Sequence, residues 1–272
     1  MLGHGTCPSV PQERRQQSLQ IRSAYTKYEY RIEIYIPENI EANAPVYYIL
    51  DGLSYYQYAK ETIRLQSVNP LKTKVENAVV VGICHQEKDM RARRFLDFTG
   101  AAESYTYPER MKDHIPAEVG GAKAFNQFIE LECKPAVQAA LPYTPTKEIL
   151  FGHSLGGYYS LWTLLHHPES FQAYIAISPS IWWNDYELLK KVQKTPLPPS
   201  PTIFIGVGEH EKFMVDDAKT IYHQLQASIK KISFYEGPEE NHASIVPTAM
   251  SRAFRFMSGT QEPRSLSPGP HR

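Results

Sequence analysis

Hydrophobic positions follow two different periods along this chain. In residues 28–36 an apolar side chain occupies every second position and polar residues lie between, which is typical of a strand with one buried face. Six other short runs are almost continuously apolar, as are strands buried on both faces of a parallel sheet. These runs are 46–50, 78–83, 148–151, 173–177, 202–207 and 232–235.

Helical periodicity occupies the intervals between these runs. Helices are predicted at 55–67, 122–140, 155–166, 186–192, 216–228 and 247–256, with a kink in the second at Pro135. Strands alternating with helices predict right-handed crossovers and an α/β fold, in which helices cover both faces of a mostly parallel sheet. We expect one domain over residues 23–258. The polar residues 1–22 are expected to be poorly ordered, and the Pro- and Ser-rich tail 259–272 to be disordered.

Residues 85–121 interrupt this alternation. The segment carries many charges and shows little periodicity, so it is interpreted as a long loop. Long loops inside compact domains are usually functional, and this one follows the end of a predicted parallel strand, where such folds place their sites. The segment is therefore expected to contribute to a site.

Charge and cysteine content exclude several classes of protein. The 29 Lys and Arg balance 29 Asp and Glu, so no overall field favours nucleic acid or an anionic membrane. Three scattered cysteines do not make a disulfide scaffold or a zinc site, and they favour a reducing compartment. No signal-peptide core and no run near the ~18 apolar residues of a membrane span is present. We expect a cytoplasmic protein with no metal, cofactor, nucleic-acid or membrane partner.

A candidate nucleophile lies in the sequence GHSLGG at residues 152–157. The pattern G-x-S-x-G alone is weak, but here a predicted strand precedes it and a predicted helix follows it. That context is typical of the α/β-hydrolase fold, in which the serine lies on a strained turn with small neighbours. The sequence therefore predicts Ser154 as nucleophile and the Leu155 N–H as one donor to the developing oxyanion.

A serine nucleophile needs a base and an acid, which in this fold follow in the order serine, acid, histidine. His242 lies between the last predicted strand and the last predicted helix, where the base belongs. Four acids follow the preceding strand: Glu209, Glu211, Asp216 and Asp217. The two aspartates fit the first turn of the next helix better. Spacing leaves both glutamates open.

The second oxyanion donor should come from the turn after an earlier central strand. The sequence YILDGLS follows the run 46–50 and offers the N–H groups of Gly52 and Leu53. An ordinary Asp51-Gly52 turn is the alternative interpretation.

Several motifs in order give the chain a wider resemblance. They are LDGLSYY, RRFLDFTG, GGAKAFNQFIELECKP, FGHSLGGYYSLWTLLHHPESF, AISPSIWW, GEHEK and NHASIVP. From about residue 28 to 256 the chain resembles the esterase family that contains enterochelin esterase, the salmochelin hydrolase and bacillibactin trilactone hydrolase. The resemblance implies Ser154 as nucleophile, His242 as base and the Leu53 N–H beside that of Leu155. A Gly-x-x-Glu pattern at 208–211 implies Glu211 as the acid.

The resemblance also implies a substrate class, because members of this branch cleave the ester backbone of catecholate siderophores. A ferric tris-catecholate carries three negative charges, so arginines near the site are expected to bind it. Arg91, Arg93 and Arg94 are candidates, with Arg94 first and Arg93 second, and a solvated charge run is the alternative. Trp183, with Trp182, is expected to face the catechol rings, with simple packing as the alternative.

The leading hypothesis is a serine ester hydrolase that opens the trilactone backbone of a ferric siderophore and so releases iron inside the cell. The alternative is a general carboxylesterase or thioesterase that acts on small acyl esters. A third hypothesis is a catalytically inactive binding protein on the same scaffold. In the first two cases the partner is a small-molecule ester.

Overall fold

One eight-stranded sheet forms the centre of the protein, whose computed structural model describes residues 15–259. The strand order is β1-β2-β4-β3-β5-β6-β7-β8. Strands β1 and β2 run antiparallel to their neighbours, and all pairs from β4 to β8 are parallel. The strands are β1 (Gln16–Arg22), β2 (Glu29–Tyr35), β3 (Val46–Ile49), β4 (Val79–Cys84), β5 (Glu148–His153), β6 (Ala173–Ile177), β7 (Thr202–Gly208) and β8 (Lys231–Gly237).

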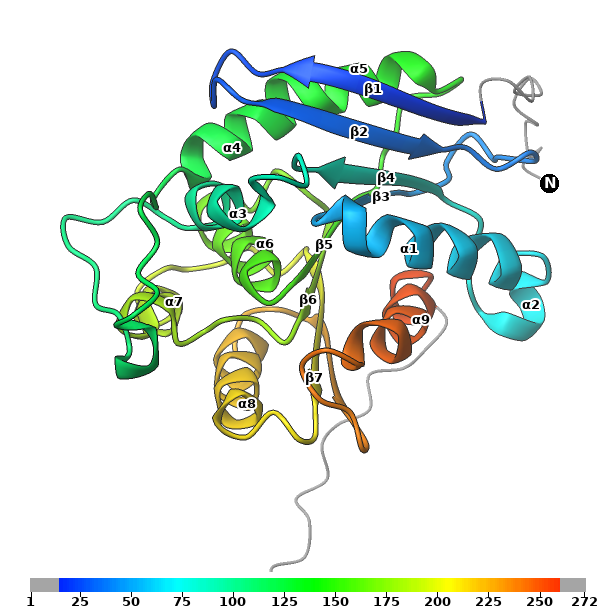
Figure 1. The fold of residues 1–272 in the computed structure, drawn as a ribbon. Coiled ribbons are helices and arrows are strands. Elements are labelled where there is room, and N and C mark those ends of the chain that lie inside the picture. The colour runs from blue at the N-terminus through cyan, green and yellow to red at the C-terminus, as the bar shows by residue number, and fades with distance from the viewer. Residues whose placement is uncertain (1–14, 260–272) are drawn as a thin grey trace, which may run out of the picture.

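Helices cover both faces of this sheet (Figure 1). They are α1 (Gly52–Gln66), α2 (Pro70–Thr73), α3 (Met90–Phe98), α4 (Ala122–Phe128), α5 (Lys134–Ala140), α6 (Leu155–His166), α7 (Trp183–Val192), α8 (Phe213–Gln226) and α9 (Ile245–Met257). Two short elements add to these, the 3-10 helix η2 (Glu109–Met111) and the π-helical turn η3 (Ile129–Cys133). No helix within residues 15–259 is long and apolar enough to cross a membrane.

The central strands are mostly apolar because the sheet has a core on each side. In β3, Tyr47 and Ile49 pack on the side of α1 and α9, whereas Tyr48 packs on the side of α6. All three side chains are fully buried. Successive residues of the strand thus point into different cores, which favours apolar side chains at every position.

The predicted fold class is confirmed: the sheet is mostly parallel with helices on both faces, as in the α/β hydrolases. All seven predicted strands and six predicted helical regions are present, with ends that differ by a few residues. The predicted helix 122–140 departs from α geometry just before Pro135, since η3 lies between α4 and α5 and Pro135 is the second residue of α5. Such π turns are a known cause of helix kinks.

The N-terminal boundary was predicted wrongly. Residues 16–22, expected to be poorly ordered, form β1, which pairs with β2 at the edge of the sheet. Leu19 and Ile21 pack on the core, and their neighbours face outward. The expectations for residues 1–14 and 260–272 concern parts of the chain outside the described residues.

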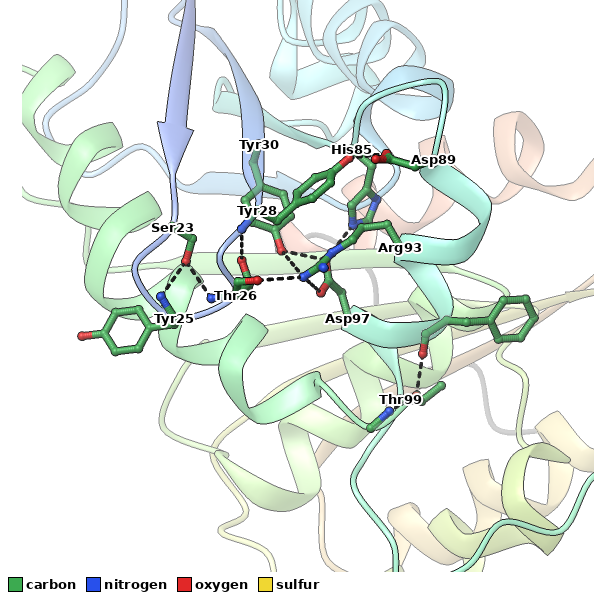
Figure 2. A network of polar contacts seen from close by, with 12 residues as sticks. Ser23, Tyr25, Thr26, Tyr28, Tyr30, His85, Asp89, Arg93, Asp97 and Thr99 are labelled. Atoms are coloured by element: carbon green, nitrogen blue, oxygen red, sulfur yellow. Dashed lines mark hydrogen bonds and ion pairs between the residues drawn. The ribbon is translucent and has the colours of Figure 1, made fainter. Parts of the chain in front are cut away.

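The segment 85–121 is also not simply a loop, because it contains α3. This helix escaped prediction because charged side chains face inward from it. Asp97 is 1% exposed and accepts hydrogen bonds from Arg93, from the Tyr30 hydroxyl (2.7 Å) and from Nε2 of His85 (2.9 Å). Figure 2 shows this network, which ties α3 to the start of β2 and to the residue that follows β4. Helix α3 is thereby fixed beside the sheet.

Candidate active site

Three sequence-predicted residues meet at one edge of the sheet. Strands β5, β7 and β8 are parallel, so the turns that follow them lie side by side at their carboxyl ends. There Nε2 of His242 lies 3.1 Å from Oγ of Ser154, and Nδ1 of His242 lies 2.6 Å from Oε2 of Glu211. An ionised carboxylate only accepts hydrogen bonds, so the proton belongs on Nδ1. Nε2 is then free to accept the Ser154 hydroxyl proton.

Ser154 occupies a strained turn between β5 and α6. Its φ of 59° and ψ of −118° lie outside the regions favoured by L residues. Gly152 permits this turn, because a Cβ there would lie 1.9 Å from the Gly156 carbonyl oxygen. A Cβ on Gly156 itself would lie 3.4 Å from the nearest atom, Oδ2 of Asp51. The first glycine of the motif is therefore a strict requirement, and the second is less constrained than expected.

Glu211 is held as an ionised partner of His242. It is 7% exposed, and its Oε1 accepts hydrogen bonds from Oγ of Ser178 (2.5 Å) and the Gly208 N–H (2.6 Å). Burial acts to raise the pKa of Glu211, but the hydrogen bonds from His242, Ser178 and Gly208 outweigh it, so this pKa lies below its ordinary value. The carboxylate is therefore charged wherever His242 acts as a base.

The other acids lie elsewhere. Glu209 is exposed, and its carboxylate accepts a hydrogen bond from the Glu239 N–H at 2.8 Å. Asp216 lies in the first turn of α8, and Asp217 follows it in the same helix. Burial raises the pKa of Asp217 to about 6. Geometry thus separates the two glutamates that spacing had left open, and only Glu211 contacts His242.

Two helix N-termini flank the serine. Leu155 begins α6, and Leu53 is the second residue of α1, which follows the neighbouring strand β3. The first N–H groups of a helix have no acceptor within the helix, so both are available to a substrate oxygen. Asp51 and Ser54 line the cavity at Ser154, but Leu53, 37% exposed, does not. The Leu53 N–H as oxyanion donor therefore stays a prediction.

A cavity of 210 Å³ opens beside the serine. Its lining consists of Asp51, Ser54, Tyr55, Met90, Arg94, His153, Ser154 and His242. The Nε–H of Arg94 donates to Oδ1 of Asp51 at 2.7 Å, and Asp51 is only 4% exposed. A buried carboxylate thus anchors a guanidinium at the wall of the cavity next to Ser154, although the two charges of this ion pair balance.

The prediction that Arg93 contacts substrate is wrong. Its guanidinium donates to both oxygens of Asp97, at 3.1 and 2.7 Å, and lies 4.6 Å from the centre of the Tyr28 ring. Figure 2 shows it facing this internal network. An α-helix turns about 100° per residue, so neighbouring arginines on α3 cannot share a direction. Arg94 reaches the cavity, whereas Arg93 anchors the helix.

The prediction that Trp183 contacts substrate is also wrong. Its side chain is fully buried and packs against Phe95, Tyr105 and Tyr107. Trp182 is partly buried beneath the guanidinium of Arg110, at 4.4 Å. The packing interpretation of this aromatic pair is the one that the structure supports.

Sequence reasoning missed three polar residues of the site. Asp51 anchors Arg94, and Ser178 holds Glu211. His153 lies with Nδ1 2.9 Å from the Tyr55 hydroxyl and with its ring 4.6 Å from that of His242. Each of the three ends a parallel strand or follows it within two residues. Polar residues at these positions were the signal that could have found them.

Acid stability should reveal the burial of His153. Burial lowers the pKa of His153 to about 3, and His242 and Arg94 act in the same direction. A histidine in an unfolded chain titrates near ~6.5. Between these two values the unfolded chain binds a proton that the folded protein does not, so stability falls as pH falls, by up to ~1.4 kcal/mol per pH unit.

We expect His153→Asn to reduce this slope of the free energy of unfolding between pH 6 and pH 4.5, measured by urea titration. The exposed His223 serves as control, and His223→Asn should keep the wild-type slope. An unchanged slope in His153→Asn would contradict the assigned burial effect.

Known proteins share this fold and this sequence pattern. The family model described as "Putative esterase" matches residues 23–243. The chain is 37% identical over 228 residues to the ferri-bacillibactin esterase BesA of Bacillus subtilis, covering 79% of each protein. It is 29% identical over 255 residues to a siderophore enterobactin esterase of Emericella nidulans, covering 79% of this chain and 82% of that one.

Solved structures agree with these matches. The BES protein from Bacillus cereus superimposes with a TM-score of 0.80 and 34% identity, covering 89% of this chain and 96% of that one. The siderophore hydrolase EstA from Aspergillus nidulans gives a TM-score of 0.76 and 25% identity, covering 95% and 99%. Sequence, fold and the geometry around Ser154 lead to the same result: the chain belongs to this esterase family and is an ester hydrolase.

Proposed function

We propose that Ser154, His242 and Glu211 form the catalytic triad of a serine esterase. Nε2 of His242 accepts the Ser154 proton while Oγ attacks the ester carbonyl carbon. Glu211 keeps the imidazole in the tautomer that can accept this proton and stabilises the imidazolium that forms. The distances of 3.1 and 2.6 Å along this chain of contacts support the proposal.

The carbonyl oxygen becomes negative in the tetrahedral intermediate. The N–H groups of Leu155 and Leu53, at the N-termini of α6 and α1, are proposed to receive that charge. The imidazolium of His242 then protonates the leaving alkoxide, which completes acylation of Ser154. Water, activated by the same imidazole, releases the acid and restores the serine.

As substrate we propose the ester backbone of an anionic ferric siderophore, whose opening weakens iron binding. The anchored Arg94 at the cavity is the observation that carries this proposal, because its guanidinium lies next to Ser154 and has more N–H donors than the one that Asp51 accepts. Relatives named as esterases of bacillibactin and enterobactin support the substrate class.

A panel of substrates tests the proposal together with Arg94→Ala. A charge-assisted hydrogen bond contributes roughly 1.5–3 kcal/mol, which corresponds to about 10- to 150-fold in kcat/KM. We expect the ratio of kcat/KM for a ferric tri-ester siderophore to that for p-nitrophenyl acetate to fall by this factor. The ratio is the readout, because unpaired Asp51 can affect both reactions.

The exposed Arg22 on β1 provides a matched control, and Arg22→Ala should keep the wild-type ratio. Equal losses on both substrates in Arg94→Ala would move the general carboxylesterase or thioesterase ahead. Hydrolysis of p-nitrophenyl esters without any hydrolysis of the ferric or iron-free tri-ester would have the same consequence.

The two glutamates should differ in effect. Glu211→Gln replaces a charged acceptor with an amide that can also donate to His242, which favours the wrong tautomer and should lower kcat by about 10⁴-fold. Glu209→Gln should leave kcat near the wild-type value, because its side chain only caps the Glu239 N–H. A larger loss in Glu209→Gln, measured on p-nitrophenyl acetate, would reverse the assignment.

We also propose the cytoplasm as the compartment. Cys84 and Cys133 are unpaired and buried, which suits a reducing environment. Burial raises the pKa of the Cys84 thiol to about 12, so this thiol stays protonated and unreactive.

A further inference from the structure

A second cavity lies against α3. Its volume is 490 Å³, and its lining consists of Glu87, Lys88, Asp89, Met90, Arg91, Ala92, Phe95, His114, Ile115, Pro116 and Ala117. We call it the α3 groove. Met90 also lines the cavity at Ser154, so one residue borders both the groove and the proposed catalytic site. The two spaces are therefore neighbours along the same helix.

Size indicates that the cavity at Ser154 cannot hold a large ester alone. Its 210 Å³ is below the roughly 300–1,000 Å³ of sites that enclose a drug-sized ligand. We expect this space to take one arm of a three-armed ester. The other arms then need surface beyond Met90, and the α3 groove is more than twice as large.

The chemistry of the groove fits an aromatic arm with an anionic edge. Its walls include Phe95, Ile115 and Pro116, and Ile115 is 55% exposed although it is apolar. At the rim, Lys88 and Arg91 are exposed and form no ion pair among residues 15–259. The lining also carries two acids: Asp89 accepts the Tyr28 hydroxyl at 2.5 Å, and Glu87 is exposed. Apolar walls with unpaired cations at the edge suit a ring that carries phenolate oxygens.

We propose that the α3 groove binds a second arm of the ester whose reacting carbonyl lies at Ser154. The inference rests on the proposed siderophore substrate and adds a subsite for its arms. Helix α3 then serves both spaces, since Arg94 faces the cavity at Ser154 and Ala92 faces the groove. The internal network around Asp97 keeps the helix in the position that both uses require.

Filling the groove tests this subsite. Ala92 is exposed on α3, so Ala92→Trp places a large ring in the groove without disturbing the core. We expect kcat/KM for a ferric three-armed catecholate tri-ester to fall by about tenfold or more. A one-armed ester with a single catecholamide, and p-nitrophenyl acetate, should be hydrolysed at the wild-type rate. Ala139→Trp, at an exposed position of α5, is the matched control.

Charge reversal supplies an independent measurement. Arg91→Glu should raise KM for the three-armed ferric substrate and leave kcat for p-nitrophenyl acetate unchanged, whereas Lys72→Glu on α2 should change neither. If Ala92→Trp and Arg91→Glu both keep wild-type kcat/KM on the three-armed ester, the groove is not a subsite. Equal losses on one-armed and three-armed esters also overturn the inference. If the wild type hydrolyses only small esters, the proposed siderophore substrate is refuted, and so is the subsite that depends on it.

Discussion

Replacing Ser154 with alanine is expected to lower kcat for ester hydrolysis by about 10⁶-fold. The reason is chemical, because no other hydroxyl lies within hydrogen-bonding reach of Nε2 of His242 among the described residues. Substrate binding should survive, since the cavity and Arg94 are unchanged. Steady-state kinetics with p-nitrophenyl acetate measures the loss, and circular dichroism verifies the fold.

Ser180 is the matched control for this experiment. Its Oγ lies 3.4 Å from that of Ser154, but its side chain is buried and forms no hydrogen bond with His242. Ser180→Ala should retain most of the activity. A fluorophosphonate should label the wild type at Ser154 and fail to label Ser154→Ala. A Ser154→Ala protein that keeps a tenth of wild-type turnover would refute the proposed nucleophile.

His242→Ala should be as inactive as Ser154→Ala, again about 10⁶-fold below wild type. Serine and histidine act as one unit, because a serine hydroxyl without its base is a poor nucleophile at neutral pH. The double variant should therefore lose little more than either single variant. Single-turnover kinetics with p-nitrophenyl acetate measures all three.

His210 provides the comparison. It is exposed, and its main contact is a backbone hydrogen bond to Glu240 that alanine retains. His210→Ala should have wild-type kinetics. Losses in His242→Ala and Ser154→Ala that differ by a hundredfold or more would show that another group is the base.

The positions of Ser154 and His242 could be predicted from the sequence, because the order of strands along the chain and the context of each motif both indicate the carboxyl ends of the parallel strands. Ser154 and His242 each lie directly between an apolar run and a helical pattern. Spacing could not choose between Glu209 and Glu211, because two residues of a tight turn differ only in side-chain direction. That direction is set by the Gly208 N–H within the turn and by the hydroxyl of Ser178, which follows a different strand, β6.

The failures around α3 have one physical cause. Periodicity assumes that charged side chains face water. In α3 the carboxylate of Asp97 and the guanidinium of Arg93 form an ion pair inside the protein. The face of α3 that carries these two charges therefore packs inward instead of facing water. The same pairing decides which arginine reaches the cavity. Trp183 escaped for a related reason, since sequence does not reveal whether an aromatic ring packs inward or lines a site.

Strand β1 was missed because an edge strand contributes little apolar sequence. Only Leu19 and Ile21 of QQSLQIR pack on the core, and a short polar run with two apolar residues does not stand out from a disordered segment. Its pairing depends on β2, a contact that no local pattern reports.

The position of β3 in the sheet has a consequence for how the protein folds. Val46 pairs with Val79 on one side and with Glu148 on the other. The four apolar residues of β3 therefore pair only with strands from distant parts of the chain. Closing such long loops slows folding, because the entropy of closure is lost before the contact forms. During synthesis β3 stays unpaired on one side until β5 has left the ribosome. Pairing of these central strands, rather than formation of any helix, is therefore expected to set the folding rate. The turn that holds Ser154 follows β5, so we expect this turn to form only after β5 has paired with β3.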